Sequence, residues 1–357
     1  MKNNIIYTDD IQIINKYLNI IPEVKRDIYF TPEYYSLYID SEEGKFMCFI
    51  FESNNKVAVY PFFKKNINTL GYNLDEEYFD IEGVYGYTGI VSNSLDANFI
   101  NDFYKAFNDY CKDNNIVAEF TRFNPLIESY LFSKDEMKVI FDRETVVLDL
   151  SNDYEDIWIN DYSSKNRNTI RKARKIGHSV DVIKNPSMSQ INSFIDIYYY
   201  SMKAANAEDY YYFKREYFYK LFSLLSSRSI LINVVDINNN IVCSSIFFNY
   251  GGYFHYHLSG RSENTDNSVN NFLLDEAIKY AKNIGAKKFH FGGGRTPDSE
   301  DSLLKFKASF SKERLKFYIG KKIHNADIYN QVVTMWENKN PELNEKYKNY
   351  LLKYRIK

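Results

Sequence analysis

The sequence predicts an α/β protein built from two similar mixed-sheet domains in tandem. Its 357 residues exceed the size at which a single hydrophobic core usually stops growing. A hydrophobic content of 45% and an aromatic content of 17% provide enough apolar side chains for two cores. One pattern of strands and helix also occurs twice. We therefore expect domains over residues 1–150 and 151–335, followed by a helical tail over 336–357.

The repeated pattern begins with a β-hairpin in each half. The segment Phe46–Phe63 matches Leu231–Phe248 without a gap, and each reads as strand, Asn-rich turn, strand. The asparagine pairs at 54–55 and 239–240 suit the positive φ that tight hairpin turns require, and the flanking β-branched and aromatic residues suit strands. Each hairpin is therefore expected to open one domain sheet.

The similarity continues beyond the hairpins. Tyr87–Gly89 aligns with Leu258–Gly260, and a polar loop, an amphipathic helix and a strand follow each. The apolar positions of the two helices are Phe103, Phe107 and Tyr110, and Leu274, Ile278 and Ala281. The strands expected after them are Ile116–Phe123 and Lys287–Phe291. This order indicates a duplication, although chance similarity between common α/β units is an open alternative.

The sequence indicates the start and the end of the second domain less clearly. Its start is expected in the polar run Ser151–Glu155, after a strand over Thr145–Leu150. Leu315–Ile319 is expected to be its closing strand, and a charged helix from about Pro341 to Tyr354 is expected to pack on the surface.

Charge and cysteine content exclude several functions. A net charge of -2 argues against a DNA-coating protein, although a local basic patch stays possible. No run of 18 apolar residues is present, so we expect a cytoplasmic protein without a transmembrane segment. Cys48, Cys111 and Cys243 lack paired spacing, which disfavours disulfides and zinc. His255 and His257 share one face of an expected strand, but they lack further ligands at diagnostic spacing. No metal is expected.

A glycine run in the second half is the first candidate for chemistry. Gly292, Gly293 and Gly294 follow a strand, and a helix over Ser302–Phe310 carries Lys307. Glycines allow a ligand to approach the backbone closely, and the lysine can meet negative charge. An ordinary turn, with Asp301 or Ser302 capping the helix, is the alternative.

A basic segment is the second candidate. It runs from Lys165 to Lys175 and ends at Gly177. On a helix, Arg167, Arg171, Arg174 and Lys175 lie near one face, where they could contact phosphate or form a solvated charged surface. The sequence contains neither a Gly-x-Ser-x-Gly elbow nor a Gly-x-x-x-x-Gly-Lys-Ser/Thr loop, so nothing favours a hydrolase or a kinase.

These segments together resemble the Fem-type transferases, which are peptidoglycan-bridge aminoacyltransferases and relatives within the acetyltransferase (GNAT) superfamily. The resemblance covers almost the whole chain. It rests on the following segments: Asp27–Tyr34, Val59–Phe62, Asp80–Gly89, Glu119–Pro125, Arg167–Gly177, Tyr199–Phe213, Leu258–Gly260, Gly292–Gly294 and Leu304–Lys307.

The resemblance implies two tandem GNAT-like domains, with the acceptor mainly on the first and the donor on the second. By position, the Phe306-Lys307 pair is implied to contact the reacting acyl group, where the ammonium could stabilise the oxyanion. We take Asp209, Tyr210 and Tyr211 as candidates to position or deprotonate the acceptor. The remaining implied substrate contacts are Tyr85, Tyr87, Arg167, Arg171, Gly292, Gly293 and Gly294.

We therefore expect an N-acyltransferase that acts on an amine of a cell-envelope precursor, either a peptidoglycan stem peptide or an amino sugar of a surface glycan. The donor is expected to be aminoacyl-tRNA or acyl-CoA, with no tightly bound cofactor, and tRNA is then a donor-carrying partner. Peripheral association with a membrane is left open. Two alternatives are an acyl-CoA-dependent N-acetyltransferase of a soluble small molecule and a non-catalytic glycan- or peptide-binding protein.

Three features depart from the Fem-type pattern. The helical arm of the larger enzymes is absent. In Ser201–Ala207, alanine replaces an arginine common in relatives, which puts phosphate recognition on the acceptor in doubt. The loop Arg261–Asn267 lacks the Arg/Gln-x-x-Gly-x-Gly/Ala pattern that cradles the pyrophosphate of coenzyme A.

Overall fold

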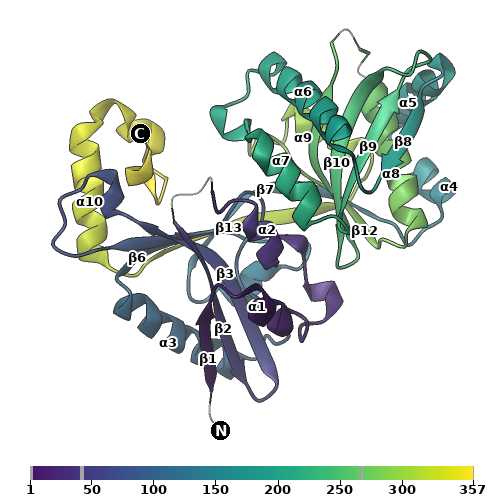
Figure 1. Ribbon diagram of the computed structural model, residues 1–357. Coiled ribbons are helices and arrows are strands. Elements are labelled where there is room, and N and C mark those ends of the chain that lie inside the picture. Colours follow the sequence, from purple (N-terminus) through teal and green to yellow (C-terminus); the bar gives the residue numbers. More distant parts are fainter. Residues whose placement is uncertain (1–2, 41–43, 264, 267, 357) are drawn as a thin grey trace. The chain divides into compact units, whose positions relative to one another are not determined.

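The computed structural model describes residues 3–40, 44–263, 265–266 and 268–356, and the chain divides into two compact units (Figure 1). The first unit comprises Met1–Asp142 and Phe317–Lys357, and the second comprises Arg143–Lys316. This division differs from the expected boundaries at 150 and 335, because the chain enters the second unit within one strand and leaves it within another.

The first unit is a mixed sheet covered by helices on both faces. Its elements are β1 (Asn4–Thr8), α1 (Ile11–Leu18), α2 (Pro32–Ser36), β2 (Lys45–Ser53), β3 (Lys56–Asn66), β4 (Phe79–Glu82), β5 (Val91–Ser92), α3 (Ala97–Asp113), β6 (Ile116–Arg122), α10 (Ala326–Lys339) and α11 (Asn344–Tyr347). Phe49 and Phe62 pack with Phe103 and Phe107 of α3 on one face. On the other face, Tyr35 of α2 stacks on strand residues.

The second unit repeats this architecture. Its elements are α4 (Tyr154–Asp156), a π-helix (Ile157–Asp161), α5 (Ser164–Ile176), β8 (Ser179–Ile183), α6 (Met188–Ala204), α7 (Arg215–Leu224), β9 (Ser229–Val235), β10 (Ile241–Tyr250), β11 (Tyr253–Arg261), α8 (Ser268–Asn283), β12 (Lys288–Gly293) and α9 (Ser302–Ala308). The buried residues of α5 and α8 join those of the sheet in one core. Helix α6 packs against β10 and β11.

Strand directions confirm the tandem arrangement of two similar domains. In the first unit β3 and β4 are antiparallel, and β4 and β6 are parallel. In the second unit β10 and β11 are antiparallel, and β11 and β12 are parallel. A helix, α3 or α8, links the parallel strands in each unit. The two halves of the chain therefore share one topology, as the repeated sequence pattern predicts.

The two repeats exchange their closing strands, which the sequence pattern did not indicate. Strand β7 (Lys138–Asp149) follows β6 in the chain, but its residues Thr145–Asp149 pair with β12 of the second unit. Strand β13 (Arg314–Ile323) follows β12, but its residues Ile319–Ile323 pair with β6 of the first unit. Each sheet is thus completed by a strand from the other repeat.

The hairpin turns differ between the repeats. Asn54 and Asn55 both have positive φ, 52° and 62°, in the expected two-residue turn. In the second hairpin only Asn239 has positive φ, and the turn is longer, because Asp236 accepts backbone hydrogen bonds from Asn238 and Asn240. A register shift between Ile241 and Cys243 follows. The expectation of an equivalent 239–240 turn was wrong, since the Asp236 carboxylate organises a wider loop.

The C-terminal segment also differs from the expected surface helix. Residues 326–339 form α10, whereas Pro341–Leu343 and Asn344–Tyr347 form only short helical turns. Trp336 and Tyr354 are almost fully buried in a cluster with residues of β6. Pro341 follows α10, where proline commonly ends a helix. The tail is therefore part of the core of the first unit.

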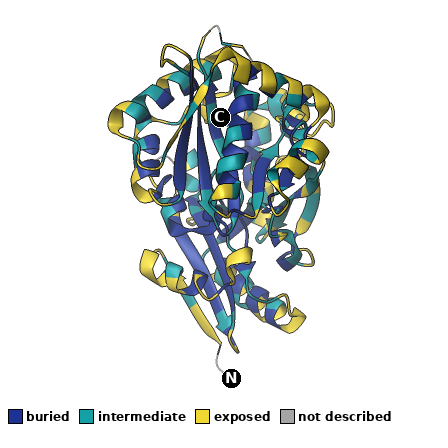
Figure 2. Cartoon of the chain, turned by 90° about the vertical axis from the view of Figure 1, so that its right-hand side faces the viewer, coloured by how far each residue is buried: buried dark blue, intermediate teal, exposed yellow. Residues whose placement is uncertain are grey.

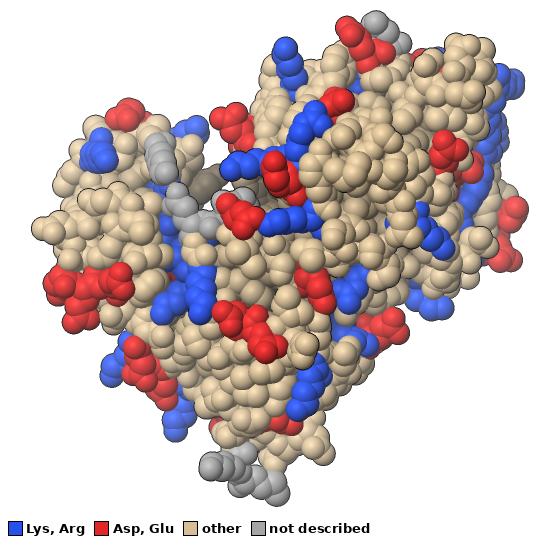
Figure 3. Space-filling view, in the orientation of Figure 1, with Lys and Arg blue, Asp and Glu red and all other residues tan. Residues whose placement is uncertain are grey.

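Burial is concentrated in the strands, and the outer faces of the helices are exposed (Figure 2). All three cysteines are buried thiols. Basic and acidic side chains are interspersed over the face in Figure 3. Within the described residues, no helix is long and apolar enough to span a bilayer. Asn264 and Asn267 of the loop expected to lack a pyrophosphate-binding pattern lie outside the described residues.

Candidate active site

The parallel strands β11 and β12 of the second unit diverge partway along their length. They pair only over Tyr253–His255 and Lys288–His290 in the described chain. Beyond this point β11 continues beside β10 as far as Arg261, and β12 continues beside β7 as far as Gly293. Beyond this point the facing edges of the two strands no longer pair with each other, so a ligand between them could form hydrogen bonds with their backbone groups.

Lys307 reaches both sides of this divergence. Its Nζ donates a hydrogen bond to the carbonyl of Gly293 on β12, at 2.7 Å, and lies 5.9 Å from the ring centroid of Tyr256 on β11. The neighbouring Phe306 packs against the core and meets Phe310 edge-on. Phe306 therefore anchors α9, and this anchoring aims Lys307 into the divergence.

Burial changes the protonation of Lys307. The side chain is only 8% exposed, and this desolvation lowers the pKa of its ammonium to about 7, while Asp301 acts in the opposite direction. The pKa of the nearby His290 is also lowered, first by burial and then by His255 and Lys307. Lys307 can therefore exist in both charge states near neutral pH.

Asp301 organises the glycine loop and the helix that carries Lys307. Its Oδ1 accepts from the backbone N–H groups of Leu303 and Leu304, both at 2.9 Å, and so caps α9. Its Oδ2 accepts from the N–H groups of Arg295 and Thr296, both at 3.2 Å. Burial would raise the pKa of Asp301, but these backbone donors hold it below its usual value.

The structure explains why glycine is present at two positions of the glycine run. Gly292 has φ of 77°, and a Cβ there would lie 3.4 Å from Nζ of Lys307. A Cβ on Gly294 would lie 2.6 Å from Oδ1 of Asp301. Arg143 of β7, which sequence reasoning missed, donates to the carbonyls of Gly294 and Arg295. No local pattern could have identified Arg143, because the exchanged strand brings it to the loop.

The candidate acceptor residues of the second unit lie on a loop next to α6. Asp209 and Tyr211 bound a short 3-10 helix, and Tyr210 and Tyr211 are 54% and 37% exposed. The hydroxyl of Tyr198 on α6 donates to the carbonyl of Tyr211 at 2.7 Å, which ties the loop to that helix.

A chain of contacts connects this loop to β11. Phe213, at the end of the loop, stacks on Tyr217 with ring centroids 4.4 Å apart. The hydroxyl of Tyr217 and Nε2 of His257 form a hydrogen bond of 2.9 Å, and His257 follows Tyr256 in the strand. His255 meets the rings of Tyr253 and His290 edge-on. The described residues contain no group of three or more metal-binding side chains.

The two arginine candidates lie on α5. Nη1 of Arg167 donates to the carbonyls of Trp158, Ile159 and Tyr162, and so caps the preceding π-helix. Arg171 is exposed, with its guanidinium 5.4 Å from the Trp158 ring. Nη1 of Arg171 also donates a hydrogen bond, to Oδ1 of Asn168 at 3.0 Å, but Arg171 as a whole is exposed, whereas Arg167 is half-buried.

Tyr85 and Tyr87 belong to the first unit. Both are partly exposed and lie in the segment between β4 and β5. Tyr87 meets Tyr29 edge-on with centroids 5.2 Å apart, and the hydroxyl of Tyr34 donates to the carbonyl of Tyr85 at 2.8 Å. The candidate residues thus form two sets, one in each unit.

Comparison with known proteins identifies the class. Residues 163–300 match the family model of the acetyltransferase (GNAT) domain. FemX has a TM-score of 0.68 at 13% identity, covering 93% of this chain and 99% of its own. A tandem GNAT protein from the clavulanic acid biosynthesis pathway has a TM-score of 0.50 at 7% identity, covering 90% and 98%. The chain has a tandem GNAT-like fold, and the match to the GNAT domain model lies within its second unit.

One curated relative connects the chain to the Fem-type group. The UDP-N-acetylmuramoylpentapeptide-lysine N(6)-alanyltransferase of Weissella viridescens is 23% identical over 174 residues, which are 48% of this chain and 50% of that protein. The match thus spans about half the length of the relative. The expected Fem-type resemblance and fold are confirmed, whereas the individual site residues stay predictions.

Proposed function

We propose that this protein is an N-acyltransferase that transfers an aminoacyl group to an amine of a peptidoglycan precursor. The observation that supports this most directly is the buried Lys307, whose Nζ contacts Gly293 on one diverging strand and lies near Tyr256 on the other. Strands that part in this way expose backbone groups to a bound acyl donor. The similarity to an alanyltransferase of a muramoylpentapeptide lysine suggests the acceptor.

In the proposed reaction, the second unit holds the donor. The first unit holds most of the acceptor, and Asp209, Tyr210 and Tyr211 of the second unit supply further acceptor contacts. The acceptor nitrogen attacks the carbonyl carbon of the donor ester, and the ammonium of Lys307 stabilises the oxyanion that forms. The nitrogen then loses one proton, the bond from carbon to the leaving oxygen breaks, and that oxygen takes a proton. The products are an amide and free tRNA, so the reaction needs no protein nucleophile. Coenzyme A would leave through sulfur in the same way.

The other candidate residues receive supporting roles. Asp301 and Arg143 hold the loop that supplies the Gly293 carbonyl. Asp209, Tyr210 and Tyr211 lie exposed on one loop, where a carboxylate and aromatic rings suit an ammonium-bearing acceptor. Arg171 is proposed as a phosphate contact, because it is an exposed residue.

The test is product detection by mass spectrometry. The protein is incubated with UDP-N-acetylmuramoyl pentapeptide or an amino sugar, with alanyl-tRNA in one series and acetyl-CoA in another. A mass gain of one amino acid residue, lost in Lys307→Ala, is the expected result. An acceptor that gains the mass of an acetyl group would instead show that the protein is an acetyl-CoA-dependent acetyltransferase. Acceptor binding without any mass gain would favour a non-catalytic binding protein.

A further inference from the structure

In the first unit, β4 and β6 are the counterparts of β11 and β12. They also stop pairing partway along their length, but here a segment of the protein itself lies beside the end of β6. Strands β4 and β6 pair over Phe79–Glu82 and Ile116–Phe120. Residues 83–88 then leave β4 and return beside the end of β6. There the N–H of Thr88 donates to the carbonyl of Arg122 at 2.6 Å, and the N–H of Arg122 donates to Oγ1 of Thr88 at 2.8 Å.

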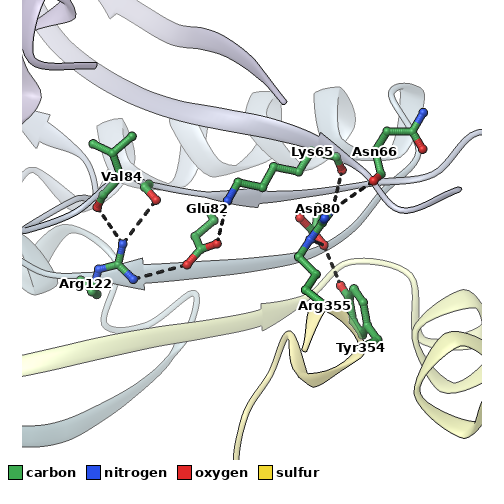
Figure 4. Close-up of polar contacts among 9 residues, drawn as sticks. Lys65, Asn66, Asp80, Glu82, Val84, Arg122, Tyr354 and Arg355 are labelled. Atoms are coloured by element: carbon green, nitrogen blue, oxygen red, sulfur yellow. Dashed lines mark hydrogen bonds and ion pairs between the residues drawn. The ribbon is translucent and has the colours of Figure 1, made fainter. Parts of the chain in front are cut away.

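The side chain of Arg122 holds this segment through its carbonyls. Nη2 donates to Val84 at 2.7 Å (Figure 4) and to Gly83 at 3.3 Å. Nε donates to Gly86 at 3.2 Å. The carbonyl between them, that of Tyr85, accepts from Tyr34. Four consecutive carbonyls, from residue 83 to residue 86, therefore accept side-chain hydrogen bonds.

Neighbouring charges hold the Arg122 guanidinium in place. Nη1 lies 3.3 Å from Glu82, and Glu82 lies 3.2 Å from Nζ of Lys65 (Figure 4). Burial would raise the pKa of Glu82, but Lys65 and Arg122 hold it below its usual value, so this carboxylate is charged at neutral pH. A lysine could keep the ion pair, but it lacks the planar fork that reaches several carbonyls at once.

The fixed backbone presents two tyrosines in a defined arrangement. Tyr85 and Tyr87 flank Gly86, whose φ is 96° and where a Cβ would lie 2.4 Å from the ring of Tyr29. The segment therefore rests directly on an aromatic ring. Partly exposed tyrosines offer an apolar ring face and a hydroxyl, which suit an amino sugar or the side chain of a peptide.

We infer that Arg122 is a positioning residue for the acceptor, because it fixes the segment that carries Tyr85 and Tyr87. The inference rests on the proposed function and deepens it, since it assigns acceptor recognition to a segment that closes the divergence of the first unit. Donor binding in the second unit is independent of Arg122.

The experiment compares Arg122→Lys and Arg122→Gln with Arg355→Gln, using the full chain. Arg355 is a matched control, because its Nε binds the buried Asp80 at 2.7 Å but it holds no carbonyl of the segment. Hydrogen exchange by mass spectrometry reports on residues 83–89. Kinetics with UDP-N-acetylmuramoyl pentapeptide and alanyl-tRNA give separate KM values for acceptor and donor.

Both Arg122 variants should accelerate exchange in residues 83–89 and raise the acceptor KM at least about tenfold, as expected for lost charged hydrogen bonds, with an unchanged donor KM. Arg355→Gln should lower stability without either effect. Unchanged exchange or an unchanged acceptor KM in Arg122→Lys would overturn the inference, and so would equal effects in Arg355→Gln. A wild-type protein that transfers nothing would refute the proposed function itself, and the acceptor role of Arg122 with it.

Discussion

At the scale of single residues, Lys307 depends on contacts from three parts of the chain. Its Nζ binds the carbonyl of Gly293, Asp301 caps its helix, and Arg143 holds the loop between them. The sequence indicated Lys307, the glycines and the Asp301 cap, because these lie within a short stretch. It could not indicate Arg143 or Tyr256, because both lie far away in the chain and reach the site only through sheet pairing.

The pKa of Lys307 predicts the pH dependence of the reaction. If the ammonium stabilises the oxyanion and the acceptor ε-amine attacks in its neutral form, kcat/KM should rise with pH below about 7, because the neutral fraction of an amine with a pKa of about 10 keeps growing up to that pH. Above about 7 Lys307 loses its proton. This loss offsets the growing neutral fraction, so kcat/KM should level off. In Lys307→Arg the charge persists, so any residual activity should keep rising through neutral pH. A wild-type kcat/KM that keeps rising above pH 7 would contradict a role for the Lys307 ammonium.

The same pKa predicts a stability effect that needs no substrate. In the folded chain Lys307 titrates at about 7, and unfolded lysine titrates at about 10.4. Between these values the unfolded state binds more protons, so the contribution of Lys307 to stability rises with pH. Lys307→Met should therefore raise the free energy of unfolding by a few kcal/mol at pH 6, and this gain should shrink towards pH 10.

Urea unfolding across this pH range measures the difference. Lys305→Met is the matched control, because Lys305 is exposed on the same helix and pairs with exposed Glu300. A pH-independent difference between Lys307→Met and the wild-type protein would contradict the lowered pKa.

At the scale of elements, local patterns indicated most helices and strands, and long-range packing decided the rest. The helical spacing of Phe103, Phe107 and Leu274 marked α3 and α8 correctly, and these residues are buried. Helix α10 has the same helical spacing of apolar residues, in Ile328, Val332 and Trp336, whereas the charged sequence after Pro341 forms only short helical turns. The buried position of the tail could not be seen locally, because its partners lie on β6.

Trp336 should therefore contribute strongly to the stability of the first unit. It is 1% exposed, and its Nε1 donates to the carbonyl of Ile356 at 2.8 Å. Trp336→Ala should cost about 3–5 kcal/mol in a buried core, and Trp336→Phe should cost less, because the ring volume largely remains. Urea unfolding measures both, with the 59% exposed Tyr350 replaced by alanine as control. Equal stabilities of Trp336→Ala and Tyr350→Ala would place the tail on the surface.

At the scale of the whole molecule, the duplication could be predicted and the exchange of strands could not. Alternating apolar residues identify a strand, but they do not specify which strand it pairs with. A boundary at residue 150 therefore looked natural after the strand-like Thr145–Leu150. In the structure Thr145–Asp149 pairs with β12, and Val146 and Leu148 belong to the core of the second unit.

This exchange predicts which fragment of the chain folds. A fragment of residues 143–316 retains the part of β7 that pairs with β12, so it should unfold cooperatively and keep Lys307 buried. A fragment of residues 151–335 lacks that strand, which exposes the edge of β12 and leaves the core without Val146 and Leu148. It should aggregate or show no cooperative transition, because unpaired apolar edges associate. Circular dichroism during urea unfolding, with size-exclusion chromatography, measures both properties. Cooperative unfolding of the 151–335 fragment as a monomer would show that the second unit does not need the exchanged strand.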